Sequence, residues 1–236
     1  MSSEATPIFG TRQLRTPRAA AVAGILFAVL YGTATLLISN SIPDDPTSSA
    51  DWLADWGGTV AFALGLIPFA GIAFLWFVGV VRDRFGPLED RFFATVFLGS
   101  GLLFLAMIFA AASLAGGLLA SYRFDPDQLV DTGLYAYGRQ VMYRINSVYA
   151  VRMAGVFMVS LGSIWIRTGS MPRWMAVLTF GTALGLLVTV TYRPWVILLF
   201  PGWVLIVSVY ILFTNLGARD GPMSVDEPRT PGSDPG

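Results

Sequence analysis

The sequence predicts an all-α fold in which a bundle of six helices crosses a membrane. Of the 236 residues, 55% are hydrophobic and only 13% are charged, which is about half of the roughly 25% that is typical of soluble domains. The mean hydropathy is +0.65. The charges are also confined to short segments, and the six apolar blocks between them are long enough to form helices across a hydrocarbon core about 30 Å thick.

The first apolar block sets the pattern for the others. It holds no charge over 21 residues, or about 31 Å of helix at roughly 1.5 Å per residue. A cleaved signal peptide is the alternative, although its apolar core usually covers only about 7–15 residues. Pro68 and Pro201 each remove one backbone hydrogen bond, so we expect kinks in the second and sixth helices. The spans are predicted at 19–39, 58–81, 92–121, 145–166, 174–192 and 194–214.

The distribution of arginine predicts how the bundle sits in the membrane. With the N-terminus inside, ten arginines fall in inner segments and four in outer segments, and Arg152 lies within the fourth span. Because short cytoplasmic loops carry the excess of Lys and Arg, we expect both ends inside, in a multi-pass protein of a bacterial cytoplasmic membrane. The domains are then a cytoplasmic arm at 1–18, a transmembrane domain at 19–218 and a disordered cytoplasmic tail at 219–236.

Several residue types are missing, which narrows the chemistry. The chain has no Cys and no His, and all fifteen of its cations are Arg. It therefore lacks a thiolate nucleophile, imidazole ligands for haem or zinc, and a lysine for a Schiff base. The spans contain no Asp or Glu, which disfavours proton or sodium coupling through buried carboxylates. Fifteen acidic residues balance the arginines, so no nucleic-acid partner is expected, and neither is a cofactor or a metal site.

The first outer loop, 40–57, is predicted to contain a short helix. A serine at 48 or 49 would cap its beginning and Gly57 would end it. Two tryptophans four residues apart share one face, which is typical of a helix resting on the membrane interface. Asp51 and Asp55 also share a face and, in the alternative interpretation, form a paired carboxylate site. The predicted interfacial anchors are Trp52, Trp56 and Trp195.

The second outer loop is predicted to begin with a short helix and to end in a long one. Asp125 is followed by Pro126 and Gln128, a pattern that favours a helix start. Downstream, 134–145 can form a helix that runs directly into the fourth span. At 100° per residue, the side chains of Tyr137, Arg144 and Arg152 would lie on one stripe of that helix.

Arg152 is the most unusual residue of the spans, because a charge within the membrane is costly. It could snorkel to the outer interface or bind a carbonyl group or an Asp of a neighbouring helix. In the functional interpretation, it lines an outward cavity with other arginines and grips a phosphate or carboxylate, for which a guanidinium is well suited. The candidate ligand-binding residues are Arg152, Arg144, Tyr149, Tyr143, Arg139 and Tyr192.

Small residues recur at helical spacing in two spans. Ala20, Gly24, Ala28 and Gly32 follow one another every four residues in the first span, and the fifth span contains the GxxxG of 181–185. Small residues allow close approach of helices in lipid. We interpret both stripes as contacts within the bundle, with a specific dimer face as the alternative.

The span pattern resembles that of uncharacterised bacterial six-helix membrane protein families. In these families a short inner turn that ends in Pro-Arg-Trp precedes a glycine-rich span, as Pro172, Arg173 and Trp174 do here. The resemblance implies a six-helix bundle. Such families have no established activity, so no functional residue is carried over from them.

The leading hypothesis is a non-enzymatic membrane module. Its outer surface of Arg, Tyr and Trp would bind a lipid or another amphiphile, or a membrane-protein partner, including a second copy of the chain. The alternative is a small transporter or permease for an anionic or amphiphilic solute. A third hypothesis is an outer-face enzyme in which two carboxylates converge on one pocket, drawn from Asp51, Asp55, Asp125 and Asp127.

Overall fold

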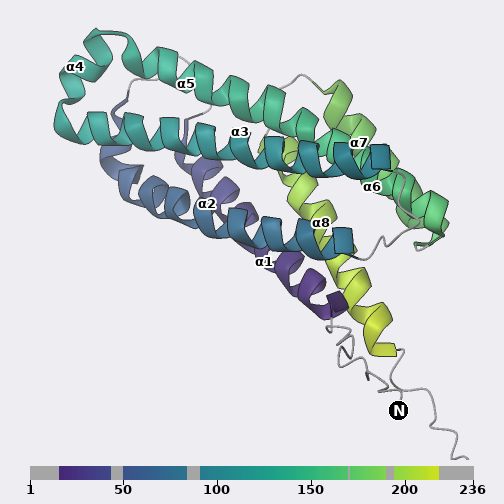
Figure 1. Cartoon of the computed structure of the whole chain (residues 1–236). Coiled ribbons are helices and arrows are strands. Elements are labelled where there is room, and N and C mark those ends of the chain that lie inside the picture. The colour runs from purple at the N-terminus through teal and green to yellow at the C-terminus, as the bar shows by residue number, and fades with distance from the viewer. Residues whose placement is uncertain (1–15, 44–49, 84–90, 170, 190–193, 218–236) are drawn as a thin grey trace, which may run out of the picture.

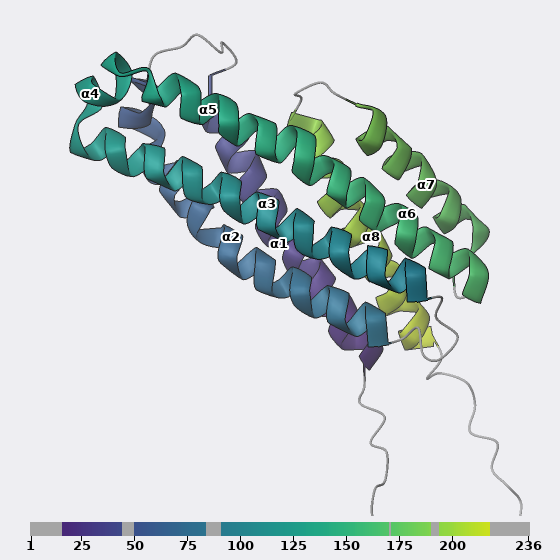
Figure 2. The same cartoon turned by 45° about the horizontal axis from the view of Figure 1, so that its top comes forward.

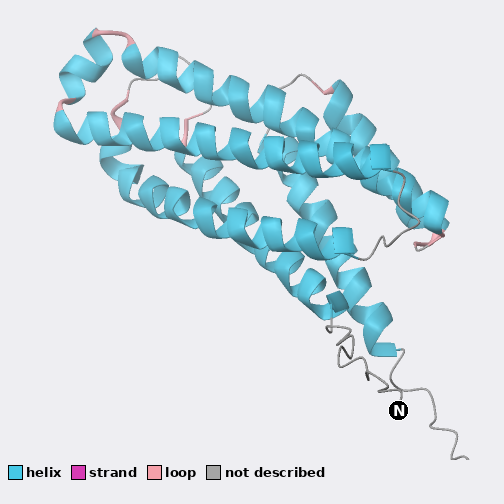
Figure 3. Ribbon diagram, viewed as in Figure 1, coloured by secondary structure: helices cyan, strands magenta, loops and turns pink. Residues whose placement is uncertain are grey.

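The computed structural model describes residues 16–43, 50–83, 91–169, 171–189 and 194–217, and within these ranges the chain is helical with short connections and no strand (Figures 1 and 3). The elements are α1 (Thr16–Ser41), α2 (Trp52–Asp83), α3 (Arg91–Phe124), α4 (Pro126–Asp131), α5 (Leu134–Arg144), the π-helix η2 (Ile145–Ala150), α6 (Val151–Thr168), α7 (Arg173–Val188) and α8 (Pro194–Gly217).

The prediction of an all-α fold is confirmed for the described residues, and five helices among them are long and apolar enough to cross a membrane, as a multi-pass protein requires. They are Ala19–Ser41, Trp52–Arg82, Phe92–Phe124, Leu134–Thr168 and Trp195–Thr214. The fourth joins α5, η2 and α6 into one rod, as predicted from 134–145. The predicted span at 174–192 corresponds to α7, an apolar helix of 16 residues, or about 24 Å. It ends at Val188, and residues 190–193 lie outside the described ranges.

The long helices run up and down the bundle. α1 packs against both α2 and α8, α3 packs against α2 and α6, and α7 packs mainly against α6 at the edge of the bundle (Figure 2). The beginning of α1 and the end of α8 lie at the same end of the molecule, and α4 lies at the opposite end (Figure 1).

Buried aromatic rings fill the middle of the bundle. Phe74 of α2 lies 4.9 Å from the ring of Phe27 in α1 and 5.5 Å from that of Phe157 in α6. Phe104 of α3 lies 4.7 Å from Phe200 of α8. All five rings are at most 3% exposed. Pairs with tilted or edge-on rings at such distances add about 0.5–1.5 kcal/mol beyond the burial of their area, so this cluster holds five helices together.

The predicted stripe of small residues in α1 is a bundle contact along most of its length. Ala20 and Ala28 are buried, and a Cβ added to Gly24 would lie 2.8 Å from the Phe77 ring and would overlap the Ser208 side chain. The stripe ends before Gly32, where a Cβ would meet no described atom within 4 Å.

The same interpretation of the GxxxG in α7 is wrong within the described chain. A Cβ added to Gly181 or Gly185 would meet no atom within 4 Å. The physical reason is that α7 turns a different face inward, with Thr179, Ala183 and Leu186 buried. The glycines therefore do not contribute to its packing against α6.

The predicted end of a short helix at Gly57 is also wrong. α2 begins at Trp52 and continues through Gly57 to Asp83. Gly57 is buried, and a Cβ there would lie 3.1 Å from the Leu119 side chain, so this glycine allows α2 to approach α3 and does not end the helix. The predicted serine cap lies in 44–49, outside the described residues.

We expect Gly24→Ala to be less stable than Gly32→Ala, a matched change in the same helix. The first adds a methyl group against the buried Phe77, and overpacking of this kind costs about 1–3 kcal/mol. The second adds it to open space and gains the helix propensity of alanine. Thermal unfolding in mild detergent measures the difference. Equal midpoints for the two variants would contradict the close contact of α1 with α2 and α8.

Candidate functional site

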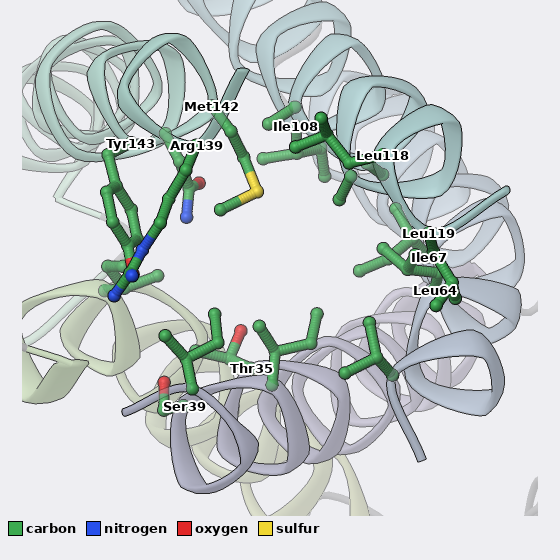
Figure 4. Close-up of a pocket in the computed structure, with 18 of the residues that line it drawn as sticks. Thr35, Ser39, Leu64, Ile67, Ile108, Leu118, Leu119, Arg139, Met142 and Tyr143 are labelled. Carbon is green, nitrogen blue, oxygen red and sulfur yellow. The ribbon is translucent and has the colours of Figure 1, made fainter. Parts of the chain in front are cut away.

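A cavity of about 110 Å³ lies between α1, α2, α3, α5, η2 and α8, on the α4 side of the aromatic cluster (Figure 4). The deepest lining residues on four helices are Tyr31, Ile67, Ile108 and Ile197. Tyr31 rests directly on the cluster, with its ring stacked on Phe27 at 5.4 Å. Tyr31 therefore separates the cavity from the aromatic cluster, and we call Tyr31 with the cluster beneath it the aromatic floor.

The walls formed by α2 and α3 are apolar from the floor to the outer end. Leucine, isoleucine and alanine side chains form most of them (Figure 4), namely Leu53, Leu64, Ile67, Ile108, Ala111, Ala112, Ala115, Leu118 and Leu119. An apolar cavity of about 150 Å³ is known to accept benzene. The space here is smaller, about 110 Å³ in all, and suits a slender apolar group.

Polar side chains gather on the wall formed by α5 and η2. Arg139, Tyr143 and Asn146 recur at helical spacing and line the cavity together, because residues three and four apart share one helix face. Thr35 and Ser39 add hydroxyl groups on the neighbouring wall, from α1 (Figure 4). The cavity therefore has an apolar depth and a polar side.

Arg139 is the central polar group of this wall, and it is only 5% exposed. Its Nε donates a hydrogen bond to the Tyr143 hydroxyl at 3.3 Å, and its Nη2 donates to the carbonyl oxygen of Pro43 at 3.1 Å. The guanidinium carbon lies 5.5 Å from the centre of the Tyr143 ring. Because a buried cation is costly unless it is hydrogen-bonded, these contacts fix Arg139 in place and tie α5 to the end of α1.

A second hydrogen bond closes the outer end of the cavity. Trp52 Nε1, at the beginning of α2, donates to the hydroxyl of Tyr135 at 2.8 Å. Tyr135 is buried and lies one helical turn before Arg139, with which it also forms a side-chain hydrogen bond. The outer ends of α1, α2 and α5 are thus joined through a continuous set of polar contacts.

The structure brings two of the six predicted ligand-binding residues, Arg139 and Tyr143, into the cavity. Arg144 and Tyr149 are exposed, and neither lines it. Arg152 is half-buried, and its Nη1 donates to the carbonyl oxygen of Val148 in its own rod at 2.9 Å. The predicted bond to a carbonyl or Asp of a neighbouring helix is therefore not the one observed, because the acceptor lies one turn earlier in the same rod. Tyr192 lies outside the described residues.

The predicted stripe of Tyr137, Arg144 and Arg152 is not a common surface. The first two are exposed, whereas Arg152 bonds to its own helix, and Gly155 and Gly162 further along α6 pack against α7. The physical reason is η2, whose hydrogen bonds follow the i→i+5 pattern. The 100° rule holds only for an uninterrupted α-helix, so it does not relate positions on the two sides of Ile145–Ala150.

The other predicted outer-face residues do not form one site. Trp52 faces the cavity, whereas Trp56 is 47% and Trp195 is 58% exposed. Asp125 caps α4 by accepting a hydrogen bond from the Gln128 backbone at 3.0 Å, as its position before Pro126 predicted. Among the described residues, no three acidic side chains are grouped closely enough to hold a metal ion.

Sequence reasoning missed most of the apolar lining and four of its polar members, which are Thr35, Ser39, Tyr135 and Asn146. A signal for Tyr135 was present, because Tyr135, Arg139 and Tyr143 recur every four residues. For Thr35 and Ser39 there was only a pair of hydroxyl residues four apart in an apolar span.

Comparison with protein-family models, characterised proteins and solved structures finds no match to this chain. Its function is therefore inferred from the geometry of the cavity.

We expect Tyr135→Phe to lower the stability of the protein and Tyr137→Phe to leave it unchanged. The first change removes the hydroxyl that accepts from Trp52, and a hydrogen bond of this type contributes about 0.5–1.5 kcal/mol. The second removes a hydroxyl from a side chain that is 70% exposed on the same helix. Thermal unfolding in detergent compares them, and a Tyr135→Phe midpoint equal to that of the wild type would show that the contact is dispensable.

Proposed function

We propose that this protein is a non-enzymatic module of the bacterial cytoplasmic membrane that binds one lipid or similar amphiphile in its outer cavity. The observation that carries the proposal is the polarity of the cavity, which is apolar at its aromatic floor and polar along the wall of Arg139 and Tyr143. Ligand sites of this kind combine an apolar lining with a few polar groups that orient the ligand. Only a few carbons of the ligand's apolar chain would occupy the depth, because the cavity measures about 110 Å³, and the head group would lie at the wall.

The level of the cavity relative to the membrane supports this proposal. Measured along α3 from Phe92, Ile108 lies about 24 Å and Leu119 about 40 Å away, at roughly 1.5 Å per residue. With the inner boundary of a hydrocarbon core of about 30 Å at Phe92, the cavity extends from the outer leaflet through the layer of lipid head groups. Arg167, whose guanidinium lies 4.7 Å above the Phe93 ring, is a cation suited to that inner boundary.

The same proposal includes six crossings with both ends inside. The beginning of α1 and the end of α8 lie at the same end of the bundle (Figure 1), which requires an even number of crossings. α7 supplies the sixth, since Val177, Leu184 and Val188 on its outer face are 62–73% exposed and are suited to contact with lipid. The excess of arginine at the end where α1 begins supports placing that end in the cytoplasm.

The head group that this wall favours is one rich in hydrogen-bond acceptors, and an anionic one above all. Guanidinium groups bind phosphate and carboxylate oxygens with strong, charge-assisted hydrogen bonds.

The alternative function, transport, requires a polar route through the bundle. Among the described residues, no polar route continues past Tyr31 toward the inner side. The five phenylalanine rings of the aromatic cluster are packed there, with their centroids 4.7–6.3 Å apart.

Filling the cavity should expel its ligand. In the double variant Ala112→Leu/Ala115→Leu, both new side chains enter the cavity lining of α3. Native mass spectrometry of wild-type protein in mild detergent should show a bound lipid mass, and the fraction carrying it should fall at least several-fold in the variant.

The matched control is Ala106→Leu/Ala110→Leu, which makes the same changes on the exposed face of α3. It should retain the adduct at the wild-type level. A wild-type protein without any retained lipid, or equal loss in both double variants, would refute binding in this cavity.

Cysteine labelling tests the orientation, and the chain is suited to it because it contains no native cysteine. Phe124, 90% exposed beside α4, and Arg173, exposed at the beginning of α7, should lie on opposite sides. In intact cells a membrane-impermeant maleimide should label Phe124→Cys and should label Arg173→Cys only after lysis. The reverse pattern would overturn the assignment of both ends to the cytoplasm.

A further inference from the structure

A second concave surface lies at the α4 end of the molecule, separate from the lipid cavity. It is a groove of about 890 Å³ between the end of α3, α4 and the beginning of α5. Its apolar members include Phe124, Leu134 and Tyr137, and its polar members include Asp125, Gln128 and Thr132. We call this surface the tip groove.

The apolar side chains of the tip groove are unusually exposed. Phe124 is 90%, Tyr137 is 70% and Leu134 is 49% exposed. They are nevertheless held on a well-defined scaffold. Asp125 caps α4 through the Gln128 backbone, and Leu129 is buried in a small apolar cluster that also contains Tyr135. Their exposure is therefore built into the fold and does not result from a frayed end.

Lipid does not account for this exposure. Phe124 lies 32 residues beyond Phe92 on α3, or about 48 Å, whereas the outer edge of the head groups lies only about 36 Å from the inner boundary of the hydrocarbon core. At a typical tilt of about 20°, the distance along the membrane normal is still about 45 Å. In the proposed orientation, the tip groove stands in the aqueous phase outside the membrane.

The charge of the tip groove indicates what it can bind. Residues 120–138 contain three carboxylates, Asp125, Asp127 and Asp131, and one arginine, Arg123, whose Nη2 donates to the carbonyl oxygen of Gly57 at 3.4 Å. The groove is therefore acidic on balance. Carboxylates at these positions repel an anionic membrane surface. They also repel a second copy of the same tip, because like charges across an interface are costly. The surface is therefore complementary to a cationic partner that presents an apolar side chain.

We propose that the tip groove is a docking site for a protein segment on the outer side of the membrane, in which an aromatic or aliphatic side chain is flanked by Lys or Arg. The apolar side chain would pack between Phe124, Leu134 and Tyr137, and the cations would face the carboxylates of α4. This site goes beyond lipid binding, and it depends only on the orientation that cysteine labelling tests.

Photo-crosslinking in the cells that naturally make the protein tests this docking site. Benzoylphenylalanine replaces Tyr137 in the groove or, as the control, Tyr149, which is 58% exposed on the same rod within the span. Adducts are digested and the crosslinked peptide is sequenced. We expect Tyr137 to give a protein adduct whose crosslinked segment is apolar and flanked by cations, and Tyr149 not to give that adduct.

The triple variant Asp125→Asn/Asp127→Asn/Asp131→Asn separates charge recognition from apolar contact alone. It should reduce the Tyr137 adduct several-fold, and retention of lipid in the cavity should be unchanged. Adducts to lipid only, no protein adduct, a crosslinked segment without cations, or an adduct that survives in the triple variant would each overturn the proposal. None of these results would affect the lipid cavity, which is tested separately by the alanine-to-leucine variants.

Discussion

Phe27, Phe74, Phe104, Phe157 and Phe200 come from five different helices and meet in the middle of the bundle, and the architecture above and below them follows from that contact. In lipid, the burial of apolar area does little to drive one helix against another, so shape and close packing carry more of the stability. Large planar rings supply such packing where several helices converge. Above the rings, the facing side chains are shorter, with three alanines on α3 and isoleucines on α2 and α8. The cavity is the space that this change in side-chain size leaves, and the rings close it below.

Helix length is the second constraint on the molecule. α2, α3 and the rod of α5, η2 and α6 have 32 to 35 residues, whereas α8 has 24 and α7 has 16. With their inner ends level, the long helices extend past the others on the outer side, where a separate apolar cluster and the bond between Trp52 and Tyr135 hold them together. Arg139 lies at the level where this extension begins. The buried cation is hydrogen-bonded there to side-chain and backbone oxygens. It therefore links α5 to the end of α1 and also gives the cavity its polar wall.

Local patterns in the sequence were sufficient to predict the helices but not the contacts between them. The apolar blocks, the cap at Asp125 and the run of 134–145 into the fourth span depend on neighbouring residues, and the structure has all three. Gly57 failed as a helix end because its role depends on Leu119, which is distant in sequence. Arg144 and Arg152 failed as a pair because a π-helix between them could not be inferred from residue types. Arg139 was a candidate among six, but its burial depends on the ends of α1 and α2, which no local pattern reveals.

In the proposed function, the outer cavity holds one amphiphile, with its chain on the aromatic floor and its head group at Arg139 and Tyr143. An experimental structure of the protein in a lipid nanodisc would show whether it does. We expect an elongated density that begins near Tyr31 and ends within hydrogen-bonding distance of the Arg139 guanidinium. A cavity closed by its own side chains, or a water-filled passage that continues past Phe74 and Phe104 to the inner side, would contradict it.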